Sequence, residues 1–393
     1  MWSDRQSPEQ LQAMVRQLGV MVSDTDLPLA TISYRAGRGV FTTPTGSVEL
    51  QGRAFDILEA VYEACRGLQG RLQGFLAYDL AAELEDIGPL PPDDSFFPQL
   101  YFNLVKGPEV PTPSTRKRQQ VECHSNLDRE AFEAAVARIV ATIHAGDIFQ
   151  TNLCRSLDAP LEPGTEWDLF QRMRAISPAR YENFIRIDDH RTLFSISPEL
   201  FLKVEAGIVE SAPIKGTRPR GRTPEQDAAL ATELLASEKD RAELAMIVDV
   251  VRNDLSRVCQ TGSVKVIRHA ELMTLPTVHH SVSTVQGRLR DNASPIDLLR
   301  AAFPAASITG APKIEAMRVA MREEGQRRGP CMGAIGWIGL NGDMEFSVAI
   351  RTAFTENGRV HYYAGCGITA DSIPADEYEE SSHKAAAFLR ALS

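Results

Sequence analysis

The sequence lacks the features that mark several specialised classes of protein. It has six cysteines but no CxxC pair, so neither a zinc ribbon nor a disulfide framework is expected, and the thiols are interpreted as reduced. The net charge is −10, and the run Arg116-Lys117-Arg118 is too short to indicate nucleic-acid binding. No run is apolar enough to span a bilayer, and the N-terminal segment contains no signal-peptide core. These absences predict a cytoplasmic protein that binds neither nucleic acid nor a membrane.

The rest of the composition is that of an ordinary globular protein. The chain has 393 residues, 43% of them hydrophobic and 24% charged, which suffices for a large core. A Pro-rich connector at 107–114 is the best internal boundary, but strand-like sequence resumes at 119–124. We therefore predict that residues 1–120 contribute to the same globular unit as a catalytic domain at 121–393.

Hairpins dominate the expected secondary structure. Asn341-Gly342 and Asn357-Gly358 each separate two strand-like runs, which is the strongest short-range hairpin signal. Because hairpins outnumber βαβ units, we predict an α+β fold with mainly antiparallel sheets and helices packed outside them. The longest helix is expected from Pro224 to about Val258, and one strand from Val348 to Phe354. Other helices are expected at 1–20, 53–66, 128–146, 296–302, 312–324 and 374–392.

One stretch, Ser211 to Gly221, has the composition of a rigid turn around a single lysine. Pro213 and Pro219 stiffen it, while its two glycines allow close approach of the backbone. Lys215 lies between an apolar residue and a glycine, where partial desolvation would disfavour the charged form and leave a nucleophilic amine. The alternative is an ordinary solvated loop lysine.

Acidic residues on two expected helices suggest a metal site. Glu377, Glu380 and Lys384 have the spacing that stacks them on one face of the last helix. Two carboxylates there are costly unless they are solvated or share a cation, which favours Mg²⁺. Glu243 lies at the mouth of an apolar helical segment and would also need a partner. The alternatives are acids favoured by the helix dipole and a simple pair of Glu243 with Lys239.

Several other residues are candidates for binding an anion. Gly365-Cys366-Gly367 ends a strand and Gly310-Ala311-Pro312-Lys313 begins a helix, so both could offer backbone N–H groups, although neither is a P-loop. Plain turn glycines remain the alternative. His279-His280 lies on an alternating run, so one ring is expected to face inward. Arg351, in the middle of its expected strand, needs an anionic partner.

Gly329-Pro330-Cys331-Met332-Gly333 fits the G-x-C-x-G elbow of class I glutamine amidotransferases. A strand should precede such an elbow and a His-x-Glu should follow it. Neither is present in the sequence, so a Cys-His-Glu glutaminase is not expected.

Taken together, these segments resemble the chorismate-utilising enzymes, which include anthranilate synthases, aminodeoxychorismate synthases, isochorismate synthases and salicylate synthases. The resemblance runs from about Asp128 to the C-terminus, and the N-terminal region is short for the family. The motifs that carry it are GDIFQTNL (146–153), SPELFL (197–202), PIKGTRPRG (213–221), DRAELAMIVDVVRNDL (240–255), FPAASITGAPK (303–313), FSVAIRTA (346–353), YYAGCGITADS (362–372) and EYEESSHK (377–384).

The resemblance implies a fold, a cofactor and a set of site residues. The fold would be two packed, mainly antiparallel sheets surrounded by helices. Mg²⁺ would be held by Glu243 and Glu380, with Glu377 nearby, and would grip the ring carboxylate of chorismate. Glu199 would be the general acid that protonates the departing C4 hydroxyl, a poor leaving group. The implied substrate contacts are Gln150, Thr217, His280, Ser307, Arg351, Gly365, Gly367 and Lys384.

Two positions discriminate among the members of the family. Members that add water have a lysine base at the position of Gln150, whereas a neutral amide resembles the members that add ammonia. A lysine at position 215 is characteristic of aminodeoxychorismate synthases and would act as a covalent catalyst at C2, whereas anthranilate synthases have a small residue there. The resemblance therefore implies amination of chorismate at C4, with ammonia from a separate glutamine amidotransferase subunit or from solution. Anthranilate synthesis is the alternative, and a catalytically silent homologue is a third.

Overall fold

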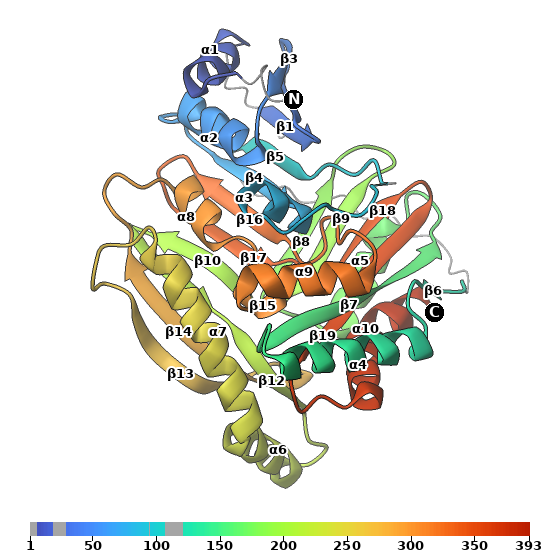
Figure 1. The fold of residues 1–393 in the computed structure, drawn as a ribbon. Helices are drawn as coiled ribbons and strands as arrows, with labels where there is room; N and C mark the ends of the chain where they lie inside the picture. Colours follow the sequence, from blue (N-terminus) through green and yellow to red (C-terminus); the bar gives the residue numbers. More distant parts are fainter. Residues whose placement is uncertain (1–5, 19–28, 94, 107–120) are drawn as a thin grey trace.

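The structure is a computed structural model that describes residues 6–18, 29–93, 95–106 and 121–393. The described residues form two antiparallel sheets with helices around them (Figure 1), which confirms the predicted α+β fold. The expected strand at 119–124 lies partly outside the described residues, which resume at Val121 and enter strand β6 at His124.

The larger sheet joins the N-terminal region to the rest of the chain. Strand β4 (Arg71–Leu76) pairs with β16 (Ala334–Gly339) over six residues, so strands far apart in sequence share one sheet. The order of the sheet is β12 (Ile214–Pro219), β14 (Val278–Arg288), β11 (Ile208–Ala212), β10 (Leu200–Glu205), β17 (Met344–Val348), β16, β4, β5 (Leu100–Val105), β1 (Ala30–Arg35), β2 (Arg38–Thr43) and β3 (Gly46–Gln51), with β13 (Lys265–Thr274) also paired to β14.

The smaller sheet is built around one long hydrogen-bonded pair. Strand β7 (Gln150–Pro160) runs antiparallel to β19 (Arg359–Ile368) along ten residue pairs, from Thr151 opposite Ile368 to Pro160 opposite Arg359. The order of this sheet is β15 (Gly310–Ala311), β7, β19, β18 (Thr352–Glu356), β9 (Thr192–Ser197) and β8 (Tyr181–Arg186), with β6 (His124–Ser125) also paired to β7.

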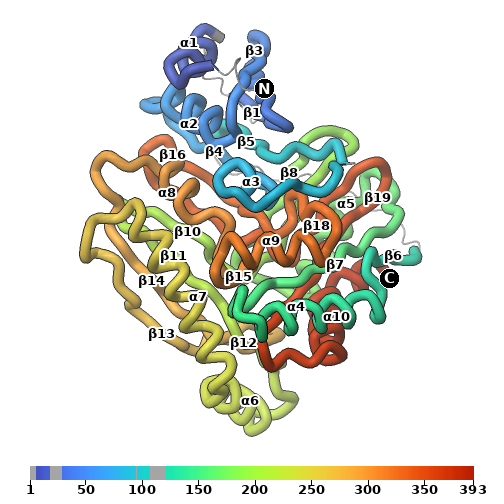
Figure 2. The backbone as a smooth tube through the Cα atoms, in the orientation of Figure 1, coloured from blue at the N-terminus to red at the C-terminus, as the bar shows by residue number. Residues whose placement is uncertain are grey.

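The helices cover the outer faces and ends of the two sheets. Helices α10 (Pro374–Leu392), α4 (Arg129–Ala145) and α5 (Glu166–Ile176) pack with the smaller sheet, while α7 (Glu238–Ser256) packs on β14 and β12 of the larger one. Figure 2 shows α1 (Pro8–Leu18) and α2 (Ala54–Cys65) at one end of the molecule and α6 (Pro224–Ala236) at the opposite end. The remaining helices are α3 (Ala81–Leu84), α8 (Pro295–Ala302) and α9 (Lys313–Glu324), with short 3₁₀ turns η1 (Tyr78–Leu80) and η2 (Ala306–Ile308).

Local sequence explains the boundaries that were predicted well. Helix α4 begins where the Asp128 carboxylate accepts from the Ala131 N–H at 2.9 Å, and it ends at Gly146, whose φ is +91°. In the hairpin of β18 and β19 both Asn357 and Gly358 have positive φ, as a two-residue turn of this kind requires.

Two predicted elements were wrong, for local reasons. The long helix at 224–258 is two helices, because Ser237 adopts an extended conformation and its hydroxyl accepts from the Asp240 N–H. The strand at 348–354 is interrupted, because β17 lies in the larger sheet and β18 in the smaller one. Arg351 lies in this crossing with φ +49° and not in the middle of a strand. The chain makes a second crossing between β9 and β10, where Glu199 lies.

Candidate active site

Side chains from both sheets converge at Gly367. A Cβ at this position would overlap the amide nitrogen of Gln150 and would lie 3.0 Å from Lys215 Nζ. Gln150 begins β7 and Gly367 lies near the end of β19, both in the smaller sheet, whereas Lys215 lies on β12 at the end of the larger sheet. The candidate site therefore lies between the two sheets, and glycine leaves the space in which the lysine and the amide meet.

Lys215 is presented by an irregularity in β12. The register with β14 shifts between Lys215, opposite Ser281, and Thr217, opposite His280, and Gly216 between them has φ +78°. This stretch is thus a bulged edge strand and not the turn that was predicted. Among the described residues, the Lys215 amine has no salt bridge and no side-chain hydrogen bond, although its charge acts on the carboxyl groups of Glu199 and Glu243. The amine is therefore open to react with or bind a ligand.

Glu199 is a buried carboxyl group at a crossing between the sheets. It is 4% exposed, and burial raises its pKa to about 7, opposed by the nearby Ser307 hydroxyl and by the charge of Lys215. One carboxyl oxygen accepts from the Ile214 N–H at 3.4 Å, which ties it to the residue before Lys215. A carboxyl group with this pKa holds a proton that it can donate near neutral pH.

Two buried polar atoms of the site, Gln150 Oε1 and His280 Nε2, have no hydrogen-bond partner among the described residues. The other ring nitrogen of His280 lies 2.9 Å from Thr217 Oγ1. Burial, together with the charge of Arg351, lowers the pKa of His280 to about 4, so the ring is neutral at pH 7. Buried polar atoms without partners are costly, and here they mark positions that a polar ligand would satisfy.

The prediction that only one of the two adjacent histidines faces inward was wrong. His279 and His280 are 2% and 4% exposed. The His279 ring lies 2.9 Å from the Asp227 carboxylate of α6, on the side of β14 away from the site. Helix α6 covers this side of the strand, which alternation along β14 could not reveal.

Arg351 is a cation without a carboxylate partner in the described part of the chain. Its guanidinium donates to the Ser177 hydroxyl at 3.1 Å, and burial lowers its pKa. The expectation that Arg351 needs an anion therefore persists in the structure, and a ligand carboxylate would supply it.

Helix α10 brings Glu380 and Lys384 to the rim of the site. Lys384 Nζ lies 2.7 Å from Glu380 and donates to the Gly365 carbonyl at 3.0 Å. Gly365 has no room for a side chain, because a Cβ would overlap the Leu153 carbonyl oxygen of β7. Burial raises the pKa of Glu380, but the charge and hydrogen bond of Lys384, together with the charges of Lys215 and Lys239, outweigh this and leave the pKa lowered, so Glu380 is an anion at neutral pH.

Glu377 makes its contact away from Glu380 and Lys384. One of its oxygens accepts from the Ser372 hydroxyl at 2.6 Å, while the other is buried without a partner in the described chain. No three His, Cys, Asp or Glu side chains of the described residues are grouped closely enough to hold a metal ion. The structure therefore does not bring Glu377, Glu380 and Glu243 together as a three-carboxylate cluster.

The two remaining carboxylates, Glu243 and Glu380, are still compatible with binding a hard cation. Burial raises the pKa of Glu243, and the charge of Glu380 contributes to the rise, which shows that the two carboxylates act on each other. Mg²⁺ is commonly bound by one or two carboxylates and completes its shell with water and substrate. The donor set of Glu243 and Glu380 is compatible with this arrangement.

The structure also adds participants that the sequence did not indicate. Ser177 contacts Arg351, and the Ile214 backbone contacts Glu199, through side-chain hydrogen bonds between different elements that no local pattern signals. Cys331 of the amidotransferase-like motif is buried and its pKa is raised by burial, which is the opposite of an activated thiol.

None of the described helices has the length and apolar character needed to cross a membrane.

The family model of the chorismate binding enzymes matches residues 30–390. This chain belongs to that family. The match begins almost 100 residues before the resemblance that the motifs indicated. It therefore includes β1 to β5 of the larger sheet.

Two relatives that match most of this chorismate binding enzyme bear different names. An anthranilate synthase component 1 of Thermus thermophilus is 34% identical, over 92% of this chain and 87% of that protein. An aminodeoxychorismate synthase component 1 of Bacillus subtilis is 33% identical, over 93% of this chain and 87% of that protein. The crystal structure of anthranilate synthase component I from Streptococcus pneumoniae TIGR4 superposes with a TM-score of 0.80 and 28% identity, covering 98% of both chains.

Proposed function

We propose that this chorismate binding enzyme aminates chorismate at C4 with ammonia and releases 4-amino-4-deoxychorismate. The observation that carries the proposal is the meeting of Lys215 Nζ with Gln150 at Gly367, next to a carboxyl group, Glu199, whose pKa is raised to about 7. A nucleophile, a neutral amide and a proton donor are the groups that this reaction needs in one place.

The substrate carries two carboxylates, and the site offers separate partners for them. Arg351 would pair with one carboxylate, and the Ser307 hydroxyl and the unpartnered His280 Nε2 would take up further oxygen atoms. Glu243 and Glu380 would hold Mg²⁺, which supplies positive charge for the ring carboxylate. Thr217, Gly365, Gly367 and Lys384 shape the surrounding wall.

In the first step the amine of Lys215 attacks C2 of chorismate. The ring double bond shifts, the C4–O bond breaks and Glu199 donates its proton to the departing hydroxyl, which leaves as water. The proton lost by the lysine nitrogen can return to the Glu199 carboxylate, because both groups face the same space.

In the second step ammonia attacks C4 and the double bond shifts back. The bond between C2 and the lysine nitrogen breaks, and the proton lost by the new amine returns to Lys215, so that one ammonia is consumed and one water released. Gln150 is neutral and cannot deprotonate a water molecule, which favours ammonia as the nucleophile. The ammonia would come from a separate glutamine amidotransferase subunit or from solution.

The test is to incubate the protein with chorismate, Mg²⁺ and an ammonium salt, and to identify the product by chromatography and mass. We expect aminodeoxychorismate from the wild type. We expect K215A to lose at least about 100-fold in kcat, while its affinity for chorismate, measured by calorimetry, changes little. Omitting ammonia should leave a protein whose mass is increased by chorismate less one water, and K215A should not form this adduct.

Two results would refute the proposal in different ways. Anthranilate as the product would place the enzyme with the relative from Thermus thermophilus and assign Lys215 another role. Unchanged turnover in K215A with aminodeoxychorismate as the product would keep the activity and remove the covalent step.

A further inference from the structure

A buried ion pair of Glu324 and Arg328 lies behind the candidate site. The two side chains are 2% and 3% exposed. Arg328 Nη2 lies 2.7 Å from one carboxylate oxygen of Glu324, and Arg328 Nε donates to the other at 2.9 Å. Neither residue has a role in the chemistry proposed above, although burying two charges is expensive unless each is fully hydrogen-bonded.

The Glu324–Arg328 pair lies along the edge of β7 just past the end of β15. Strand β15 has only two residues, Gly310 and Ala311, so it pairs with β7 at Gln150 and Thr151 alone. One residue further, the Asn152 N–H donates to the Thr309 carbonyl at 2.8 Å. Further along the same edge, Asn126 bonds the backbone of Ser156 and β6 then pairs with β7. Between Asn152 and Ser156 the edge has no neighbouring strand in the interior of the protein, where unpaired backbone groups are costly.

Arg328 and Glu324 supply the missing hydrogen bonds. Arg328 Nη2 donates to the Asn152 carbonyl at 2.7 Å, and the Glu324 carboxylate accepts from the Cys154 N–H at 2.7 Å. The Arg328 donor and the Glu324 acceptor alternate along the edge of β7 as the N–H and C=O groups of a neighbouring strand would. On the other edge of β7, Asn152 and Cys154 lie opposite Gly367 and Gly365, the two glycines of the candidate site.

The same guanidinium reaches the turn that carries Ser307. Arg328 Nη1 donates to the Ile308 carbonyl at 3.0 Å. The N-terminal region holds the arginine in place: the Tyr78 ring lies 4.4 Å from the guanidinium, and the Asp79 carboxylate accepts from the N–H groups of Arg328 and Gly329. One side chain thus connects η1, η2 and β7.

We infer that Arg328, with Glu324, is a positioning residue for the chorismate site. The pair stands in for a strand along β7 and fixes the distance between Gln150, on β7, and Ser307, on η2. The inference rests on the proposed location of the substrate between these residues, but it holds for whichever product the enzyme forms. Loss of the guanidinium would let β7 and η2 shift apart without removing any group that touches the substrate.

The experiment is chemical rescue of R328A by guanidinium. The variant lacks the side chain that bonds both carbonyl groups, and a displacement of about 1 Å in a site can cost about 100-fold in rate. We expect kcat for chorismate consumption to fall by about that factor and to recover when guanidinium chloride is added well below denaturing concentrations. Sodium chloride at equal concentration should not restore activity.

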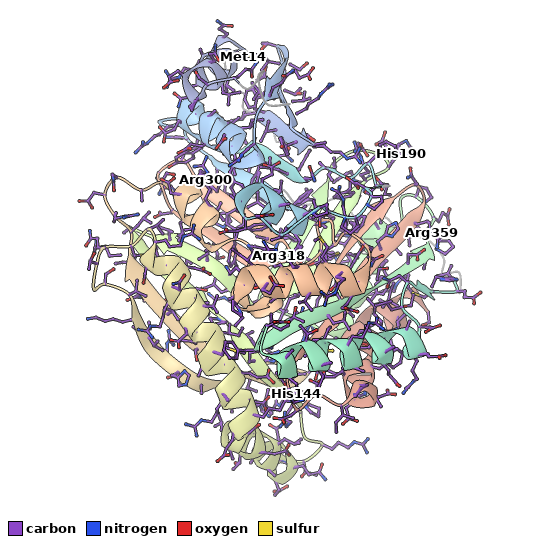
Figure 3. All side chains as sticks on the ribbon, viewed as in Figure 1. Met14, His144, His190, Arg300, Arg318 and Arg359 are labelled. Carbon is purple, nitrogen blue, oxygen red and sulfur yellow. The ribbon has the colours of Figure 1, made fainter. Side chains whose placement is uncertain are left out.

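R300A is the matched control. Arg300 is also paired with carboxylates, Asp56 at 2.9 Å, Glu59 at 2.7 Å and Asp297 at 3.4 Å, but it lies on α8, away from β7 (Figure 3). We expect R300A to lose stability and to show no rescue of kcat. Measuring chorismate affinity by calorimetry, with and without guanidinium, gives a readout that does not depend on turnover.

The results for the Arg328 variants each support or overturn the inference. Wild-type kcat in folded R328A would overturn the inference, as would guanidinium that raises the melting temperature of R328A without restoring kcat. If R328A does not fold, R328K tests the inference in its place. The lysine ammonium can still pair with Glu324 but cannot reach both carbonyl groups. The kcat of R328K should therefore fall while its melting temperature stays at the wild-type value. Wild-type kcat in R328K would overturn the inference. Failure of the wild type to consume chorismate would refute the proposed function instead.

Discussion

Glu199, the proposed proton donor, is buried at a cost in stability. Burial raises its pKa to about 7 from an ordinary value of 4.5. Between these values the unfolded chain loses the proton while the folded protein keeps it. The folded state therefore loses stability as pH rises through this window, and only the protonated form can act as a proton donor.

We therefore predict opposite effects of E199Q on activity and on stability. The variant should lose turnover, because an amide cannot donate the proton. It should be more stable than the wild type by roughly 3 kcal/mol at about pH 8 and little changed at about pH 4, because the amide has no charge to desolvate. Urea unfolding at the two pH values measures this, and a difference independent of pH would contradict the assignment. In the wild type, kcat should decline as pH rises above about 7.

A second prediction at this scale concerns Gly367. G367A should lower kcat by about 100-fold, because the methyl group would overlap the Gln150 amide and crowd Lys215 Nζ. G52A is a matched control, since a Cβ at Gly52 would meet its nearest neighbour, Ile57, at an ordinary 3.7 Å. Steady-state kinetics of both variants gives the comparison, and equal kcat values in the two would show that the space at Gly367 is not needed.

At the scale of elements, the break between α6 and α7 determines how the edge strand β12 is held. Arg218 on β12 pairs with Glu233 of α6 at 2.7 Å and with Asp240 of α7 at 3.3 Å. Gly216 packs directly against the Asp240 side chain. Both helices therefore support the strand that carries Lys215, and an unbroken helix would present only one of these partners.

Ser237 should be the residue that stabilises this break. S237A removes the hydroxyl that accepts from the Asp240 N–H and should lower the free energy of unfolding by about 1 kcal/mol. S237D keeps an acceptor at the cap and should lose less. Urea unfolding of both variants measures the difference, and the idea is wrong if Ala and Asp are equally destabilising.

At the scale of the whole molecule, the proposed cation site lies between two packing units. Glu243 lies on α7, which packs on β14 of the larger sheet, and Glu380 lies on α10, which packs on β19 of the smaller sheet. A cation bound by both carboxylates would link the two sheets through their helices. Metal binding should therefore affect global stability as well as catalysis.

We predict that Mg²⁺ raises the melting temperature and that a chelator abolishes turnover reversibly. At 100 times the dissociation constant, binding to the native state alone contributes about 3 kcal/mol. E243Q should lose this response, whereas E379Q should keep it, because Glu379 on the same helix pairs with Arg129 of α4. A shift of equal size in E243Q and the wild type would exclude Glu243 as a ligand.

The sequence by itself determined the local elements and the chemistry that the residues can perform. Asp128 and Gly146 set the ends of α4, and Asn357-Gly358 set a hairpin, because caps and turns depend on neighbouring residues. Its motifs also indicated the family, which the match over residues 30–390 confirms. The break at Ser237 was missed because a serine is equally acceptable inside a helix until tertiary contacts favour its role as a cap.

Only the tertiary structure decided which of these residues meet. Arg351 was assigned to a strand, but the chain leaves one sheet for the other there, and sheet membership is a property of pairing partners far away in sequence. The meeting of Gln150, Lys215 and Gly367, and the separation of Glu377 from the other acids, follow from strand register and from helix packing. The edge of β7 that Arg328 and Glu324 complete exists only because β15 stops after two residues. Such contacts depend on the relative placement of whole elements, which local sequence patterns do not contain.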